Sequence, residues 1–147
     1  MDSESASPHP DFAQALRRVF QTAAVPGLCS AYLFGSHHEG HAHRQSDIDV
    51  AVLLDRGRYP TARERFQERL RLSSWLSHVL RQREIDVVVL NEAPPPFARR
   101  IVTAGEQVFC ANAAADHDFV RDTQLRAADL EPFLRRARKI KLGAIAR

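Results

Sequence analysis

Two aspartates, Asp47 and Asp49, stand at the start of an apolar run that ends at Leu54. Residues i and i+2 of a strand point to the same face, with Cα atoms roughly 6.5 Å apart. Two carboxylates held this close in an apolar setting repel each other and are costly to remove from water. Protonation, basic partners or a cation would relieve that cost. Because Mg²⁺ prefers oxygen ligands and often shares carboxylates with substrate phosphates, the pair indicates a candidate metal site.

A third carboxylate, Asp86, lies inside another apolar segment that continues to Leu90 and is typical of a strand. If that strand pairs beside the one that carries Asp47 and Asp49, all three carboxylates reach one cluster. Such a cluster can hold two metal ions roughly 3.5–4 Å apart, which stabilises both the attacking and the leaving oxygen of a phosphoryl transfer.

Gly35 and Ser36 precede the first aspartate by a gap of ten residues. Glycine lets the backbone approach a phosphate closely, and a helical turn after Ser36 would aim N–H groups at a triphosphate. Taken singly, these fragments are equally typical of a strand-end turn and of solvent-facing or salt-bridged aspartates. Their combination, with a third aspartate on a strand, favours a site for a nucleotide and its metal.

Four histidines lie in the gap between the two motifs, namely His37, His38, His41 and His43. Imidazole suits Zn²⁺ or Ni²⁺, so a transition-metal site is one interpretation. The irregular spacing favours the other interpretation, a solvated polar loop that touches the nucleotide.

The elements that must position these residues follow from hydrophobic periodicity and from turn residues. Thr61 and Glu64 form a capping box that opens a long helix, and Gly105 ends a short one. The predicted strands are Leu28 to Phe34, Asp47 to Leu54, Glu84 to Leu90 and, as a short edge strand, Gln107 to Cys110. The predicted helices run from about Asp11 to Pro26-Gly27, from Thr61 to about Arg81, from Pro94-Pro95-Pro96 to Thr103, and from about Asp116 to Lys141. Asp11 with Gln14 can cap the first of them, and Pro132 kinks or divides the last.

Apolar residues at helical spacing predict which side of each long helix is buried. In the first helix these residues are Phe12, Leu16, Val19, Phe20 and Ala23. In the second they are Phe66, Leu70, Trp75, Leu76, Val79 and Leu80, and in the last they are Phe119, Leu125, Leu130, Phe133 and Leu134.

The order of elements predicts an α/β or α+β domain in which helices flank a small mixed sheet. With 147 residues, 44% of them hydrophobic, the chain has room for one core, and we expect a single domain at 11–147 after a disordered segment at 1–10. No apolar run of about 18 residues and no secretory signal pattern is present, so we expect a cytoplasmic protein that does not span a membrane. Cys29 and Cys110 are predicted to be buried free thiols.

The net charge of +3 is too small to identify a nucleic-acid binder. Basic residues nevertheless crowd the C-terminal end, where they are either a solvated helix end or a docking surface for an acidic partner or RNA. They are Arg135, Arg136, Arg138, Lys139 and Lys141.

At its motif residues the chain resembles the DNA polymerase β-type nucleotidyltransferase superfamily, whose signature is Gly-Ser, a ten-residue gap and Asp-x-Asp. The match reads Gly35-Ser36, then Gly40 in the loop, then Ser46-Asp47-Ile48-Asp49-Val50. The chain is most similar to the minimal nucleotidyltransferases, the MNT partners of HEPN toxins in prokaryotic toxin–antitoxin pairs. The resemblance covers Leu28 to Leu90 well and the rest only by size and order of elements.

This resemblance implies a polymerase β-like nucleotidyltransferase fold and an AMP transfer from ATP to a tyrosine of a HEPN ribonuclease. Asp47 and Asp49 would ligate two Mg²⁺ ions, and Asp86 would complete the cluster and help to deprotonate the acceptor hydroxyl. Gly35, Ser36 and Ser46 would bind the nucleotide. Attack on the α-phosphorus would release pyrophosphate.

Two other functions remain open. One is a small-molecule nucleotidyltransferase of the aminoglycoside-modifying kind, although only 57 residues (147 − 90) follow Leu90 to build an acceptor pocket. The other is a non-catalytic antitoxin that neutralises its toxin by binding, although such a protein has no physical need for three carboxylates in apolar strands. Direct binding of nucleic acid is left open.

Overall fold

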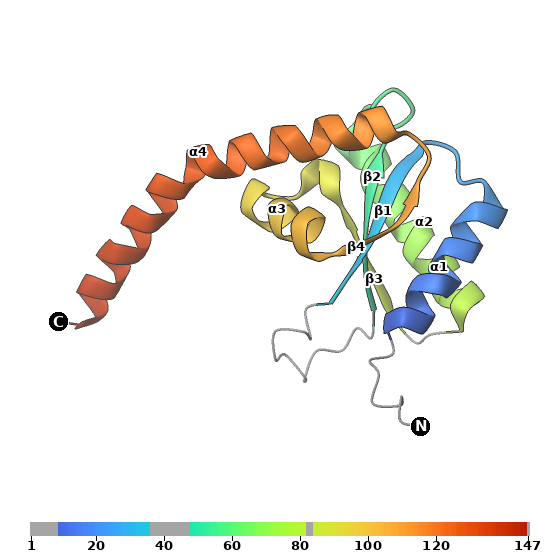
Figure 1. Cartoon of the computed structure of the whole chain (residues 1–147), viewed down its shortest axis with the longest axis horizontal. Coiled ribbons are helices and arrows are strands. Elements are labelled where there is room, and N and C mark those ends of the chain that lie inside the picture. Colours follow the sequence, from blue (N-terminus) through green and yellow to red (C-terminus); the bar gives the residue numbers. More distant parts are fainter. Residues whose placement is uncertain (1–8, 36–47, 82–83, 147) are drawn as a thin grey trace.

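The computed structural model describes residues 9–35, 48–81 and 84–146 of the chain. Four main helices and four strands follow the predicted order, with one short 3₁₀ helix added (Figure 1). They are α1 (His9–Ala23), β1 (Leu28–Phe34), β2 (Ile48–Leu54), α2 (Ala62–Leu80), β3 (Ile85–Val89), η3 (Leu90–Glu92), α3 (Pro95–Ala104), β4 (Glu106–Cys110) and α4 (Ala113–Ala146).

The four strands form one mixed sheet in the order β3-β2-β1-β4. β1 pairs antiparallel with both β2 and β4, whereas β2 and β3 run parallel, joined by the crossover through α2. The predicted mixed sheet flanked by helices is therefore confirmed, and so is the predicted position of β4 at an edge. β2 is buried along its whole length, as expected for a central strand covered on both faces.

α1 and α2 cover one face of the sheet. Leu16 and Phe20 of α1 and Leu72 and Leu76 of α2 pack on alternate strand residues in the larger core cluster. Two details of the predicted first helix are wrong. α1 begins at His9, so Asp11 lies inside the helix and is not its N-cap, and Ala23 at its end is exposed because it has passed the edge of the core.

α3 and the first turns of α4 cover the other face (Figure 1). Ala98 and Ile101 of α3 pack there against Tyr32 and Leu53, with Phe119 of α4 partly buried beside them. Gly105 ends α3 as predicted. Its backbone lies so close to its surroundings that an added Cβ would come within 2.6 Å of the Ile101 carbonyl oxygen.

The predicted capping box of α2 is present, because Thr61 accepts from the Glu64 N–H and the Glu64 carboxylate accepts from the Thr61 N–H. The predicted buried side of this helix is right at Leu76, which is fully buried, and wrong at most other positions. Phe66, Leu70 and Val79 are 51%, 53% and 43% exposed, and Trp75 and Leu80 are only partly buried. The fully buried positions are Arg65, Glu68, Leu72 and Leu76.

The reason is that ion pairs let charged residues occupy the inner side of the first turns of α2. Arg65 pairs with Glu92 and donates to the Tyr59 carbonyl at 2.7 Å, and Glu68 accepts two hydrogen bonds from Arg71 at 2.9 and 2.6 Å. Buried charges that are paired and hydrogen-bonded are tolerated, and their aliphatic stems cover the sheet.

α4 is one continuous helix of 34 residues, so Pro132 does not divide it. Its N-terminal part lies against the rest of the molecule, and its C-terminal part extends away from the sheet and from α3 (Figure 1). The predicted buried side is confirmed only at its start. Leu125 is 61% exposed because it lies on the outer side of the helix, between the buried Thr123 and Ala127. Phe133 is 63% exposed and Leu130 and Leu134 are each 37% exposed, because the helix has run past the edge of the domain there.

The prediction of two buried thiols is half right, since Cys29 is buried and Cys110 on the edge strand is exposed. Within the described ranges, no helix combines the length and the apolar character needed to cross a membrane.

Candidate active site

Asp49 and Asp86 lie side by side at one end of the sheet. They are register partners in the parallel ladder of β2 and β3, so their Cα atoms are about 4.8 Å apart and their side chains leave the same face. Asp49 is only 2% exposed, whereas the side chain of Asp86 on the edge strand is 40% exposed. The predicted pairing of the strands that carry these two aspartates is confirmed.

Gly35 belongs to the same end of the sheet. It follows Phe34, the last residue of β1, which is the register partner of Asp49. Phe34 is in turn held by an edge-to-face contact with Phe97 of α3, with ring centroids 5.9 Å apart. The antiparallel pairing of β1 and β2 thus brings the end of one strand and the start of the next together, as the spacing of the motifs requires.

Several predicted site residues lie outside the described residues. They are Ser36, Ser46, Asp47 and the four histidines of the intervening segment, His37, His38, His41 and His43. Their roles, and the choice between a metal site and a solvated loop for the histidines, stay predictions.

The described part of the site has the chemistry that a hard divalent cation requires. Asp49 is a carboxylate in a buried strand, and its desolvation is costly unless positive charge or hydrogen-bond donors compensate for it. Asp86 adds a second set of carboxylate oxygens on the neighbouring strand. The described residues contain no complete group of three metal-ligating side chains, so a third ligand would have to come from Asp47 or from the substrate.

Arg69 of α2 is a site residue that the sequence analysis missed. Its Nη2 lies 3.8 Å from Oδ1 of Asp86 and its Nε donates to the Val87 carbonyl at 2.7 Å. The sequence analysis considered only the apolar residues of α2 and assigned no role to Arg69. Helical spacing from the residues that are buried, Arg65, Leu72 and Leu76, places it at the sheet edge.

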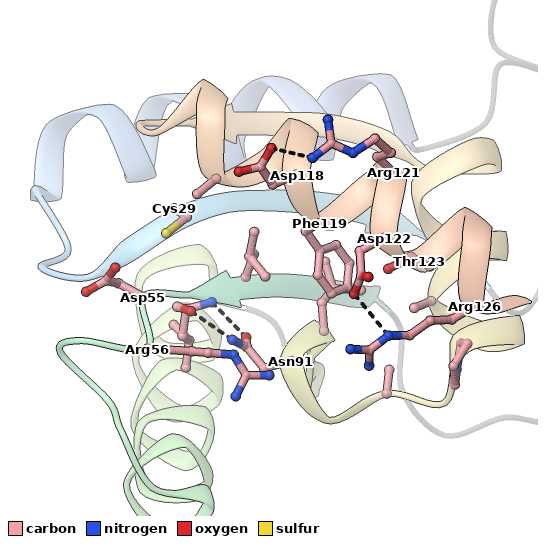
Figure 2. A pocket seen from close by; sticks show the side chains of 17 residues that line it. Cys29, Asp55, Arg56, Asn91, Asp118, Phe119, Arg121, Asp122, Thr123 and Arg126 are labelled. Atoms are coloured by element: carbon pink, nitrogen blue, oxygen red, sulfur yellow. Dashed lines mark hydrogen bonds and ion pairs between the residues drawn. The ribbon is translucent and has the colours of Figure 1, made fainter.

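A pocket of about 730 Å³ opens at the opposite end of the sheet, between the ends of β2 and β3 and the start of α4 (Figure 2). Leu54 at this end is five residues from Asp49, which is roughly 16 Å along a strand. The lining carries three arginines and three aspartates, namely Arg56, Arg121, Arg126, Asp55, Asp118 and Asp122. Within α4 these charges pair with one another, at 3.2 Å for Asp118 and Arg121 and at 3.1 Å for Asp122 and Arg126. The pocket therefore lacks the excess of positive charge that a triphosphate needs.

Cys29 lines the same pocket but is no candidate nucleophile. Burial, and after it the nearby Asp55 carboxylate, raises the pKa of its thiol, so the reactive thiolate is scarce near neutral pH. The chemistry of the chain is thus concentrated at the end of the sheet that carries Asp49 and Asp86.

A buried carboxylate beside a second one, at the junction of two strands in a helix-flanked mixed sheet, defines a nucleotidyltransferase-type site. The family model described as "Polymerase beta, Nucleotidyltransferase" matches residues 15–114, which is more than half of the chain. The chain belongs to this family.

One similar curated protein is the protein adenylyltransferase MntA of Shewanella oneidensis, which is 35% identical over 85 residues, or 58% of this chain. That match spans only 56% of MntA. A solved toxin–antitoxin structure with AMP-PNP contains a chain of the same fold, with 25% identity, a TM-score of 0.57 and coverage of 92% of this chain and 98% of that one. A chain in the structure of a tri-AMPylated HEPN toxin from Shewanella oneidensis with its MNT antitoxin has 23% identity and a TM-score of 0.57, with coverage of 92% and 99%.

Proposed function

We propose that this chain is a Mg²⁺-dependent nucleotidyltransferase that transfers AMP from ATP to a tyrosine of a partner HEPN ribonuclease and so acts as its antitoxin. The observation that carries the proposal is the register pairing of Asp49 with Asp86 in a chain of the nucleotidyltransferase family. Carboxylates on neighbouring strands offer the oxygen ligands that Mg²⁺ shares with substrate phosphates.

In this reaction the chain holds the substrate and moves one proton. Asp47, Asp49 and Asp86 would hold Mg²⁺, which would neutralise charge on the phosphate oxygens. Gly35, with Ser36 and Ser46, binds the nucleotide. The acceptor hydroxyl oxygen forms a bond to the α-phosphorus, the bond from that phosphorus to the bridging oxygen breaks, and pyrophosphate leaves. The acceptor proton passes to the carboxylate of Asp86, whose greater exposure on the edge strand suits it to meet an incoming group.

The choice of a protein as acceptor rests on two observations. The similar curated relative is a protein adenylyltransferase, and a chain of the same fold is bound to an AMPylated HEPN toxin. This chain also carries an exposed surface suited to a protein partner, on the part of α4 that extends beyond the domain (Figure 1).

That surface, here called the α4 arm, comprises residues 129–141. Its apolar side continues the buried side of the same helix, since Leu130 and Leu134 follow Thr123 and Ala127 at helical spacing. The exposed apolar residues of the arm are Leu130, Phe133, Leu134 and Ile140. Between residues 135 and 141 the arm has five Lys or Arg and no Asp or Glu, so we assign it to a partner with an apolar groove bordered by acidic residues. Two copies of the arm side by side would bring like charges together.

The experiment that tests the proposed function is intact-mass spectrometry of a co-expressed HEPN-family candidate partner. The partner is incubated with this chain, Mg²⁺ and each of the four NTPs. We expect it to gain whole AMP units with the wild type and none with the Asp47→Asn, Asp49→Asn double variant. Asp118→Asn is the matched control, because this exposed carboxylate pairs only with Arg121 in its own helix and should leave transfer unchanged.

Full transfer by the double variant would contradict the two-metal site. A stable complex without any gain of mass would favour the antitoxin that works by binding alone. Transfer to an added aminoglycoside, with none to the protein, would favour the small-molecule enzyme.

A further inference from the structure

Arg69 reaches around the outer edge of the sheet to the candidate active site. β3 is an edge strand, so part of its backbone has no neighbouring strand to bond. Two side chains of α2 serve these groups: Nε of Arg69 donates to the Val87 carbonyl at 2.7 Å, and Oγ of Ser73 donates to the Ile85 carbonyl at 2.6 Å. The Ser73 side chain extends no further, whereas the guanidinium of Arg69 continues toward the face of the sheet that carries Asp86.

Three groups hold the guanidinium in place. The first is the Val87 carbonyl. The second is the ring of Phe66, whose centroid lies 5.9 Å from the Arg69 Cζ. The third is the Asp86 carboxylate, whose Oδ1 lies 3.8 Å from the Arg69 Nη2. Both members of the ion pair are about two-fifths exposed, at 41% and 40%. A pair this exposed adds little to the free energy of unfolding, so stability alone is a weak reason for this arrangement.

We propose that Arg69 is a positioning residue for Asp86. Its guanidinium holds the Asp86 carboxylate at the outer side of β3 and competes with the divalent cation for that carboxylate. The inference rests on the proposed function, since it takes Asp86 as a ligand and proton acceptor of that site. Arg69 cannot lose its charge in the physiological range, so its attraction for Asp86 persists whether or not a cation is present. When a cation binds, it must share the carboxylate with the guanidinium.

Two consequences separate this role from a structural one. Removing the guanidinium removes a unit charge about 4 Å from a metal ligand, which even with the full screening of water changes the affinity for a cation about fivefold. Removing the restraint on Asp86 should also lower kcat about tenfold, because the proton acceptor is no longer held in place, while the KM for ATP stays the same.

The test measures binding of Mn²⁺ alone, by electron paramagnetic resonance, to the full chain and its variants. We expect Arg69→Met to bind Mn²⁺ about fivefold more tightly than the wild type, and Arg69→Lys, which keeps the charge, to bind within twofold of the wild type. Ser73→Ala is the matched control, since it removes the other hydrogen bond from α2 to the β3 edge without changing charge. Thermal unfolding of each variant confirms that it is folded.

Equal Mn²⁺ affinities of the wild type and Arg69→Met would overturn the inference, and so would the same affinity shift in Ser73→Ala. A raised KM for ATP with unchanged kcat in Arg69→Met would also overturn it, because Arg69 would then contact the nucleotide. Failure of the proposed function looks different. In that case the wild type and Asp49→Asn would bind Mn²⁺ equally weakly, whatever residue stands at position 69.

Discussion

Asp49 is the buried member of the carboxylate pair, and its burial has opposite consequences with and without a cation. A carboxylate that is 2% exposed loses most of its hydration on folding, which costs free energy. A divalent cation that binds the carboxylate offsets this cost, and it binds the folded chain but not the unfolded chain. The metal should therefore stabilise the fold through Asp49.

We expect Mg²⁺ to raise the melting temperature of the wild type and to leave that of Asp49→Asn unchanged. At a metal concentration one hundred times the Kd, the stabilisation of the wild type is about 2.7 kcal/mol, which corresponds to roughly 5 °C or more for a domain of this size. Differential scanning calorimetry with and without Mg²⁺ measures both melting temperatures, and an equal Mg²⁺ shift in the variant would contradict the site.

At the scale of single residues, the sequence predicted most of the described site. Asp86 could be placed beside Asp49 because both aspartates interrupt apolar strands, and neighbouring strands of a small sheet tend to pair. Arg69 could not be predicted. Its approach to Asp86 depends on its contacts with the edge strand β3, which no spacing in the sequence indicates.

At the scale of elements, α4 is attached to the sheet by a buried polar network. Asp116 in its first turn is 5% exposed and accepts hydrogen bonds from the hydroxyls of Ser30 at 2.7 Å and Tyr32 at 2.8 Å. Gln107 of β4 donates to the Tyr32 hydroxyl oxygen at 3.2 Å. Hydrogen bonds to a charged group contribute about 1.5–3 kcal/mol each to the free energy of unfolding, so this network holds the start of α4 against the sheet.

Removing the Tyr32 hydroxyl should destabilise the fold in a pH-dependent way. Burial, and after it the hydrogen bond to Asp116, raises the pKa of Tyr32 well above its ordinary value of 10.0. The folded chain therefore keeps the phenol protonated where the unfolded chain releases the proton. This contribution to stability is fully present below about pH 10 and is lost as the pH rises from there toward the folded-state pKa.

We expect Tyr32→Phe to lower the free energy of unfolding by about 2 kcal/mol at pH 8 and by clearly less at pH 11. Urea denaturation at the two pH values measures the difference. Tyr59→Phe, which removes a tyrosine hydroxyl that donates to the Pro26 carbonyl at 3.0 Å, is the matched control for loss of a tyrosine hydroxyl outside this network. A Tyr32→Phe deficit that is as large at pH 11 as at pH 8 would contradict the role of the raised pKa.

The errors in the predicted buried sides of α2 and α4 show the limit of helical periodicity. An apolar residue at helical spacing predicts burial only where the helix has something to bury it against. α2 places paired charges such as Arg65 and Glu68 on its inner side, and α4 continues past the domain that its first turns cover. The strands were predicted more accurately, because a central strand with both faces covered is apolar throughout, as β2 is.

At the scale of the whole molecule, the fold keeps the proposed active site apart from the proposed docking surface. The carboxylates lie at one end of the sheet, at the starts of β2 and β3, whereas α4 starts beside the pocket at the other end and then leaves the domain (Figure 1). A partner held by the α4 arm is therefore bound through a surface separate from the catalytic residues. Binding and transfer should be separable by mutation.

We expect Phe133→Asp in the α4 arm to weaken binding of the HEPN partner without changing the fold or the metal site. Phe133 is 63% exposed and lies 5.5 Å from the guanidinium of Arg136, so its ring meets no core that the substitution could disturb. A buried aromatic anchor in an interface contributes about 2 kcal/mol or more, so the Kd should rise roughly thirtyfold. Deletion of residues 135–147, which removes Ile140 and the five basic residues of the arm, should also weaken binding.

Isothermal titration calorimetry with the partner measures the Kd, and Mn²⁺ affinity and melting temperature should match those of the wild type. Leu70→Asp is the matched control, since Leu70 is a comparably exposed apolar residue on α2, outside the α4 arm. If the arm is the docking surface, transfer by Phe133→Asp should recover at high partner concentration, because only KM for the partner has changed. A Kd that stays the same in Phe133→Asp and in the deletion would exclude the arm and direct the search to the surface around Phe66 and Leu70.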